Sequence, residues 1–173
     1  AGTALSTGCK SHNGSLGVLT DKVTPVTSIA KWAQDAGAAV GITTSVTVDH
    51  ATPAAFYAHV GGRKEYYKIG QQLIESQYDF FAGSDFYAPK NPVEGGADLY
   101  VQAQQGGYTI AKGYNNYQKL SKKADKIILF QSDVANKKDH KCLPYAIDRT
   151  KNDLSLSDIT RASINFLTKK QKE

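Results

Sequence analysis

The stretch NNYQKLSKKADKIILF, Asn115–Phe130, decides the fold class. A short helical segment over 115–120 leads into the run Ile127–Phe130, in which every residue is apolar. A strand that is apolar on both of its sides is typical of a parallel sheet that is covered by helices. We therefore interpret this stretch as one helix and strand unit of an α/β protein.

The same order of helix, glycine and apolar run occurs earlier in the chain. The expected strands cover residues 38–44, 79–83 and 108–111. The first helix is expected to be capped by Thr27 or Ser28 and to end at Gly37. The apolar stripes of the helices are Ile29, Trp32, Ala33 and Ala36, then Tyr66, Ile69, Leu73 and Ile74, then Leu99 and Ala103. These units predict a mainly parallel sheet flanked by helices on both faces, with right-handed crossovers.

Other segments complete this outline. A last helix is expected from Leu156, with Ser155 and Asp158 as a capping box, and no strand follows it. Residues 84–97 and 131–154 carry no clear periodicity and are interpreted as long connections. A short helix that ends at Gly8 is expected near the start of the chain, and Asn13-Gly14 is a turn signal.

Length and charge limit the possible functions. The 173 residues suit one domain, and no apolar run is long enough to span a membrane. The net charge of +5 is concentrated between Lys119 and Lys141, where seven lysines face three aspartates. That stretch has no arginine and few aromatic residues, so we interpret it as a solvated face and expect no nucleic-acid partner. Cys9 and Cys142 could form a disulfide or remain two buried thiols, and their spacing matches no zinc motif.

Two segments are dense in small or reactive residues. The first covers residues 1–14, and the second, DHATPAAFYAHVGGR, covers Asp49–Arg63. The second follows the expected strand 38–44, and ligands of open α/β sheets bind beyond the carboxyl ends of strands. Pro53 suits the first turn of a helix with Thr52 as its cap. His59 stands among apolar neighbours and is expected to be a hydrogen-bonded core histidine.

These two segments resemble parts of the alkaline phosphatases. AGTALSTGCKSHNGSLG, residues 1–17, is similar to the helix and turn that directly follow the nucleophilic serine in that family, and HATPAAFYAHVGGR, His50–Arg63, is similar to the segment that carries a magnesium ligand and the phosphate-binding arginine. The segments occur in the order and at about the spacing of the family. The resemblance implies an alkaline-phosphatase-like α/β core in which residues 1–173 form a single partial domain, incomplete at both ends.

The resemblance also implies roles for particular residues. Arg63 matches the arginine that binds two phosphate oxygens, and Thr52 matches a hydroxyl ligand of magnesium. His50 stands where some members have an aspartate ligand and others a histidine, so it either ligates the metal or acts through water. The serine, the zinc ligands and a glutamate ligand of magnesium would lie outside this sequence. We therefore expect zinc and magnesium in the complete protein and few or no tightly bound metals here.

The function implied for the complete protein is hydrolysis of phosphate monoesters through a phosphoserine. The chain alone is expected to be inactive. The alternatives are a related metal-dependent hydrolase of phosphate or sulfate esters, and a non-catalytic domain that binds oxyanions. The resemblance further implies a periplasmic or secreted location and a possible homodimer.

Overall fold

The structure, a computed structural model that describes residues 1–171, is built on a parallel sheet. Its strands are β1 (Gly41–Thr43), β2 (Phe80–Gly83), β3 (Tyr108–Lys112) and β4 (Lys126–Phe130). They are ordered β1-β2-β4-β3, and every neighbouring pair is parallel. The prediction of a parallel α/β sheet is therefore confirmed.

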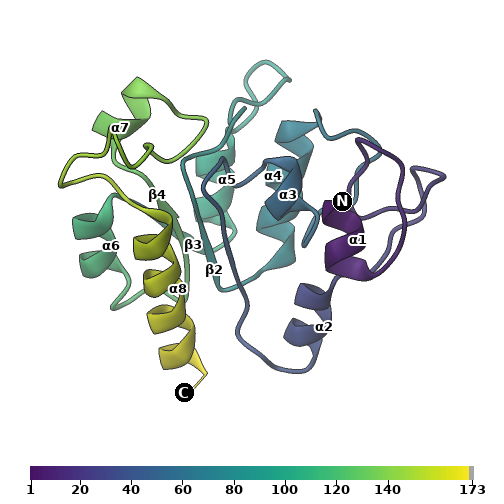
Figure 1. The fold of residues 1–173 in the computed structure, drawn as a ribbon, viewed down its shortest axis with the longest axis horizontal. Helices are drawn as coiled ribbons and strands as arrows, with labels where there is room; N and C mark the ends of the chain where they lie inside the picture. The colour runs from purple at the N-terminus through teal and green to yellow at the C-terminus, as the bar shows by residue number, and fades with distance from the viewer. Residues whose placement is uncertain (172–173) are drawn as a thin grey trace.

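Helices cover both faces of this sheet (Figure 1). Successive strand residues point to opposite faces, so Phe80 and Phe81 enter different hydrophobic clusters. The cluster around Phe81 includes the buried residues of α4 (Tyr66–Ser76) and α5 (Leu99–Gln105). The cluster around Phe80 includes those of α6 (Tyr114–Leu120) and α8 (Leu156–Lys170). The continuous apolar runs in the sequence arise from this coverage on both sides.

Strand β1 differs from the expectation. The interval 38–44 was expected to be a buried strand, but only Gly41–Thr43 pair with β2, and all of these residues are half-buried. The reason is position, because β1 forms an edge of the sheet among the described residues. Its apolar character therefore does not correspond to burial on both faces.

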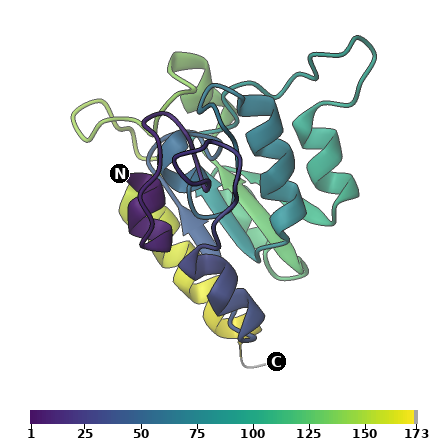
Figure 2. The same ribbon diagram turned by 90° about the vertical axis from the view of Figure 1, so that its right-hand side faces the viewer.

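The predicted inward stripe of the first helix was also partly wrong. Helix α2 (Ile29–Asp35) begins at Ser28, whose Oγ accepts a bond from the N–H of Lys31 at 3.2 Å, so Ser28 rather than Thr27 is the cap. Ile29 and Trp32 are each 59% exposed, whereas Ala30 is buried. This helix of seven residues lies beside α1 (Gly2–Thr7) at the periphery and rests on its alanine side (Figure 2). Small side chains allow the close approach, and the large ones point outward.

The last helix matches its prediction, and one short helix was missed. Helix α8 has the complete Ser155–Asp158 capping box, and it buries Ile159, Ala162 and Phe166. Helix α7 (Asp133–Lys138) lies within the interval 131–154, which was expected to be irregular. It buries only Ala135, so it has no apolar stripe, and its cap Ser132 was the available signal. Among residues 1–171, no helix is long and apolar enough to cross a bilayer.

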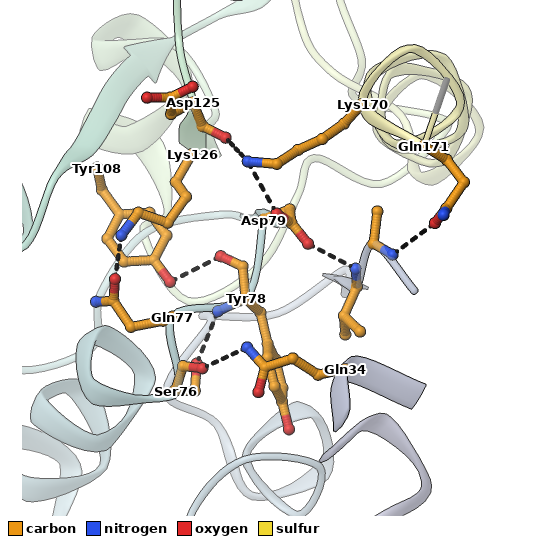
Figure 3. Close-up of polar contacts among 12 residues, drawn as sticks. Gln34, Ser76, Gln77, Tyr78, Asp79, Tyr108, Asp125, Lys126, Lys170 and Gln171 are labelled. Atoms are coloured by element: carbon orange, nitrogen blue, oxygen red, sulfur yellow. Dashed lines mark hydrogen bonds and ion pairs between the residues drawn. The ribbon is translucent and has the colours of Figure 1, made fainter. Parts of the chain in front are cut away.

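Polar contacts join the elements at the amino ends of the strands (Figure 3). Asp79, just before β2, accepts a bond from the N–H of Val40 at 2.8 Å and pairs with Lys170 at 3.0 Å. Lys170 also donates to the carbonyl oxygen of Asp125 at 2.6 Å, and Gln171 accepts from the N–H of Ala39 at 2.9 Å. The end of α8 is thereby fastened across β1, β2 and β4.

Candidate functional site

The site begins with the packing of α1 against α3 (Ala51–Ala54). Ser6 Oγ donates to the carbonyl oxygen of Ala55 at 2.7 Å. A Cβ atom added at Gly2 would lie 3.1 Å from Cβ of Ala55, so the two helices are close. Gly8 ends α1 in a left-handed conformation, as expected for a terminating glycine. The small residues of segment 1–8 thus allow close contact with the segment after β1.

The loop after α1 lies against the chain just before α4. Leu16 and Val60 form an antiparallel bridge, and the N–H of Arg63 donates to the carbonyl oxygen of Gly14 at 2.7 Å. Thr3 Oγ1 accepts a bond from the N–H of Gly17 at 3.1 Å. Gly14 has a φ of 87° and forms the turn expected for Asn13-Gly14. The structure therefore brings together both sequence segments that carry the resemblance.

A cavity of about 550 Å³ lies between these segments. It is bounded by the start of α1, by residues 10–16, and by Ala51, Thr52 and Arg63. The side chains of Thr52 and Arg63 are both exposed to solvent. No carboxylate of residues 1–171 forms an ion pair with Arg63. The guanidinium is therefore available to an anion that enters the cavity.

His50 contacts Arg63 from outside the set of lining residues. Its Nε2 lies 3.4 Å from an Nη atom of Arg63, while its Nδ1 is buried and has no hydrogen-bond partner among the described residues. Burial and, to a smaller extent, the charge of Arg63 lower the pKa of His50 below its ordinary value of 6.5. The imidazole is therefore neutral at pH 7, which is the form that can accept a bond from Arg63 or bind a metal ion.

Two local expectations about this segment were wrong. Thr52 lies inside α3, and the N-cap position is held by His50, which makes no side-chain capping bond. The hydroxyl of Thr52 is therefore not used for capping. His59 is exposed rather than in the core, although its Nδ1 lies 2.7 Å from the carbonyl oxygen of Gly17. Its apolar neighbours in sequence point inward while His59 itself faces solvent.

Asp49 is a buried polar residue for which no role was predicted from the sequence. Its carboxylate is fully buried and accepts bonds from the N–H of Tyr87 at 2.9 and 3.0 Å. Burial raises its pKa to about 6, and the bond from Tyr87 opposes that rise. Nearby, Tyr57 Oη donates to the carbonyl oxygen of Val48 at 2.5 Å. Asp49 therefore joins the loops after β1 and β2, and the signal for it was a carboxylate in the segment that follows the carboxyl end of β1.

The magnesium-binding roles expected of His50 and Thr52 stay predictions. His50 contributes a neutral imidazole with an unpartnered buried nitrogen, and Thr52 contributes an exposed hydroxyl. No group of three His, Cys, Asp or Glu side chains within residues 1–171 could hold a metal ion. A complete zinc or magnesium site needs more ligands than this pair. Cys9 and Cys142 are both free and half-buried, so the two thiols stay separate and neither adds such a group.

The comparisons with known proteins agree with this architecture. A family model described as alkaline phosphatase matches residues 1–173. An alkaline phosphatase of Gadus morhua is 28% identical over 207 residues, which cover 95% of this chain and 43% of that protein. The solved alkaline phosphatase of the Antarctic bacterium TAB5 superposes with a TM-score of 0.80 at 28% identity, covering 97% of this chain and 46% of that one.

A mutant of the TAB5 enzyme with Mg bound in its M3 site is similarly close in structure. It has a TM-score of 0.80 and 26% identity, and the match covers 98% of this chain and 46% of that one. The chain thus spans less than half the length of each of these relatives. The match of the family model extends over every residue of the sequence. The chain therefore belongs to the alkaline phosphatase family.

Proposed function

We propose that this chain is the phosphate-binding part of a metal-dependent phosphomonoester hydrolase that works through a phosphoserine. The observation that carries the proposal is the exposed guanidinium of Arg63, which borders a cavity shared with Thr52 and has no acidic partner among residues 1–171. A planar guanidinium can donate two parallel bonds to phosphate oxygens. In a phosphoryl transfer, it would stabilise the negative charge on those oxygens.

His50 and Thr52 have supporting roles in this proposal. The neutral His50 ring accepts from Arg63 across 3.4 Å, which orients the guanidinium without neutralising it. Thr52 would also provide a magnesium ligand. His50 would act on the metal through water, because the ring nitrogen that remains when Nε2 accepts from Arg63 carries the proton. A bound magnesium or zinc ion would supply positive charge and an activated oxygen nucleophile. A periplasmic or secreted location and a homodimer belong to the same proposal and follow from the family alone.

Phosphate binding by the chain itself tests the role of Arg63. We expect titration calorimetry to show that Arg63→Ala weakens the binding of inorganic phosphate by about 1.5–3 kcal/mol, the range for charge-assisted hydrogen bonds. Arg161→Ala is the matched control, because Arg161 is an exposed arginine of α8 outside this cavity. Equal affinity for phosphate in Arg63→Ala and Arg161→Ala would contradict the proposal.

Hydrolysis of p-nitrophenyl phosphate tests whether the chain is sufficient for catalysis. We expect no faster hydrolysis by the chain than by its Arg63→Ala variant, because the described residues contain no complete metal site. Zinc-dependent turnover that Arg63→Ala abolishes would show instead that the chain holds the full catalytic machinery. Binding of sulfate as tight as that of phosphate would favour a sulfate-ester hydrolase or a general oxyanion-binding domain.

A further inference from the structure

A second cavity of the structure shares no lining residue with the one that Arg63 borders. It is a groove of about 740 Å³ between α6 and α8, which lie side by side at the end of the molecule away from α1 and α3 (Figure 1). The two helices are joined beneath it by Tyr117, whose Oη donates to the carbonyl oxygen of Ala162 at 2.8 Å. The volume falls within the range of ordinary ligand sites.

Three lysines surround this groove. Lys119 and Lys122 come from α6 and the turn after it, and Lys169 comes from the last turn of α8. All three are exposed, and none forms an ion pair within residues 1–171. No acidic side chain of the described residues lines the groove. The lysine-rich stretch 119–141 therefore contributes only some of its lysines to the groove. Lys137, Lys138 and Lys141 lie outside it.

Neutral polar groups and aromatic rings complete the lining. Asn115, Gln118, Ser121 and Asn165 can all donate hydrogen bonds, and the buried rings of Tyr117 and Phe166 lie between the two helices. The residues at 115, 118, 119 and 122 follow the spacing of one helical face, and Asn165 and Lys169 are one turn apart on α8. One face of each helix therefore presents donors and positive charge to the same space.

We propose that this groove binds a linear polyanion with closely spaced phosphate or sulfate groups. Lysine ammonium groups on flexible stems act as point charges and provide no fixed fork for a single phosphate. A ligand that carries several charges in a row can neutralise all three lysines at once, and it gains affinity by releasing its counterions. The binding does not depend on Arg63 or on the proposed hydrolase function.

The test measures binding of fluorescently labelled linear inorganic polyphosphate over a range of salt concentrations. We expect the triple variant Lys119→Gln, Lys122→Gln, Lys169→Gln to bind at least about tenfold more weakly at moderate salt. We also expect its slope of log affinity against log salt to fall by about two, since each lost contact removes about 0.7 on a single-stranded polyanion. Replacing the same lysines with arginine should keep both the affinity and the slope.

The control triple Lys137→Gln, Lys138→Gln, Lys141→Gln removes the same charge outside the groove, and Arg63→Ala removes the other candidate anion site. Both are expected to change the affinity less than about threefold. Thermal melts followed by circular dichroism verify that each variant is folded. The proposal is overturned if the wild-type chain does not bind, if the two lysine triples lose affinity equally, or if Arg63→Ala loses as much as the groove triple.

A second arm replaces polyphosphate with heparin to identify the source of the anionic groups. Equal affinity with the same dependence on Lys119, Lys122 and Lys169 means that the groove recognises charge spacing in either polymer. Binding of polyphosphate alone restricts the ligand to phosphate chains. If neither polymer binds in a way that depends on these lysines, the three side chains serve only to balance the helix ends, and the proposal is wrong.

Discussion

Polar groups at the amino ends of the strands are bonded differently from those beyond the carboxyl ends. We call these two sides of the sheet the amino edge and the carboxyl edge. At the amino edge, Asp79 and Lys170 pair at 3.0 Å, and Tyr108 Oη donates to the carbonyl oxygen of Tyr78 at 2.8 Å (Figure 3). Beyond the carboxyl edge, Nδ1 of His50 and Oε1 of Gln131 are buried without a partner among the described residues. At the amino edge these polar groups bond to one another. At the carboxyl edge some buried polar atoms have no hydrogen-bond partner among the described residues.

This difference has an energetic meaning. A buried polar atom without a partner destabilises a fold by about 1–3 kcal/mol. One of these atoms belongs to His50, whose other ring nitrogen lies 3.4 Å from an Nη atom of Arg63, the main candidate for ligand binding. We infer that the amino edge holds the fold together and that the carboxyl edge gives up part of that stability for binding.

The largest expected loss of stability comes from Gly17→Ala, which tests how rigid the carboxyl edge is. Gly17 has a φ of 60°, and a Cβ there would lie 2.0 Å from the carbonyl oxygen of Ala58 and 2.8 Å from Nδ1 of His59. Gly17→Ala combines backbone strain with a clash against backbone, so we expect it to lower the free energy of unfolding by at least about 3 kcal/mol. Denaturant titration measures this change.

Gly8→Ala is the matched control for Gly17→Ala. Gly8 has a φ of 73°, but a Cβ added there meets nothing within 4 Å. The variant keeps the strain without the clash and should cost only about 1–2 kcal/mol. Similar losses in the two variants would mean that the loop is free to move away from Ala58, and the carboxyl side would then be less rigid than the contacts imply.

The next largest expected loss of stability comes from removing the contacts of Asp79 at the amino edge. Asp79 is 15% exposed, and it accepts from both the N–H of Val40 and the ammonium of Lys170. Removing both bonds in Asp79→Ala should lower the free energy of unfolding by about 2–3 kcal/mol, whereas Asp79→Asn keeps an acceptor for Val40 and should lose less. Chemical denaturation of the two variants, read beside the wild type, gives these values.

An exposed ion pair serves as the control for Asp79. Lys31 and Asp35 pair on α2, with side chains 49% and 58% exposed. Asp35→Ala should change the free energy of unfolding by less than about 0.5 kcal/mol, since surface pairs contribute little. If Asp79→Ala proved as mild as Asp35→Ala, the contacts of the amino edge would not be what holds the strands and α8 together.

The strands could be predicted from the sequence, but the polar contacts at their amino ends could not. The apolar run 127–130 lies within β4, Lys126–Phe130, because burial on both faces produces an unmistakable pattern. The role of Asp79 depends on Lys170, which is 91 positions away and reaches it only when α8 packs on the sheet. Long-range polar pairs leave no local signal. Ile29 and Trp32 were placed inward for a related reason, since helical spacing identifies a face but not whether a neighbour covers it.

The candidate site shows the same division between local and long-range information. The resemblance to the alkaline phosphatases pointed to His50, Thr52 and Arg63 as candidates, but the sequence could not show that Arg63 would approach His50 to 3.4 Å. Capping rules assigned the Thr52 hydroxyl to the start of α3, and the structure leaves it exposed at the cavity. Helix α3 begins two residues earlier than expected, with His50 at its N-cap. The hydroxyl of Thr52 is therefore free to contact a ligand.

The smallest expected effect addresses the unpaired atoms of the carboxyl edge directly. His50→Phe keeps a planar ring and removes the buried Nδ1 that has no partner in the described chain. We expect the free energy of unfolding to stay the same or rise by up to about 1 kcal/mol, because an apolar ring carries no unmet hydrogen bond. Thermal and chemical denaturation of the purified variant measure this change.

Phosphate affinity is the second measurement on His50→Phe. The guanidinium of Arg63 loses the acceptor that lies 3.4 Å away, so its orientation is less restricted and phosphate should bind more weakly. A variant that is more stable but binds less phosphate would show that His50 is kept at a cost to the fold. A loss of about 2 kcal/mol or more in stability would instead place His50 among the groups that hold the structure together, and the contrast between the two edges of the sheet would no longer hold.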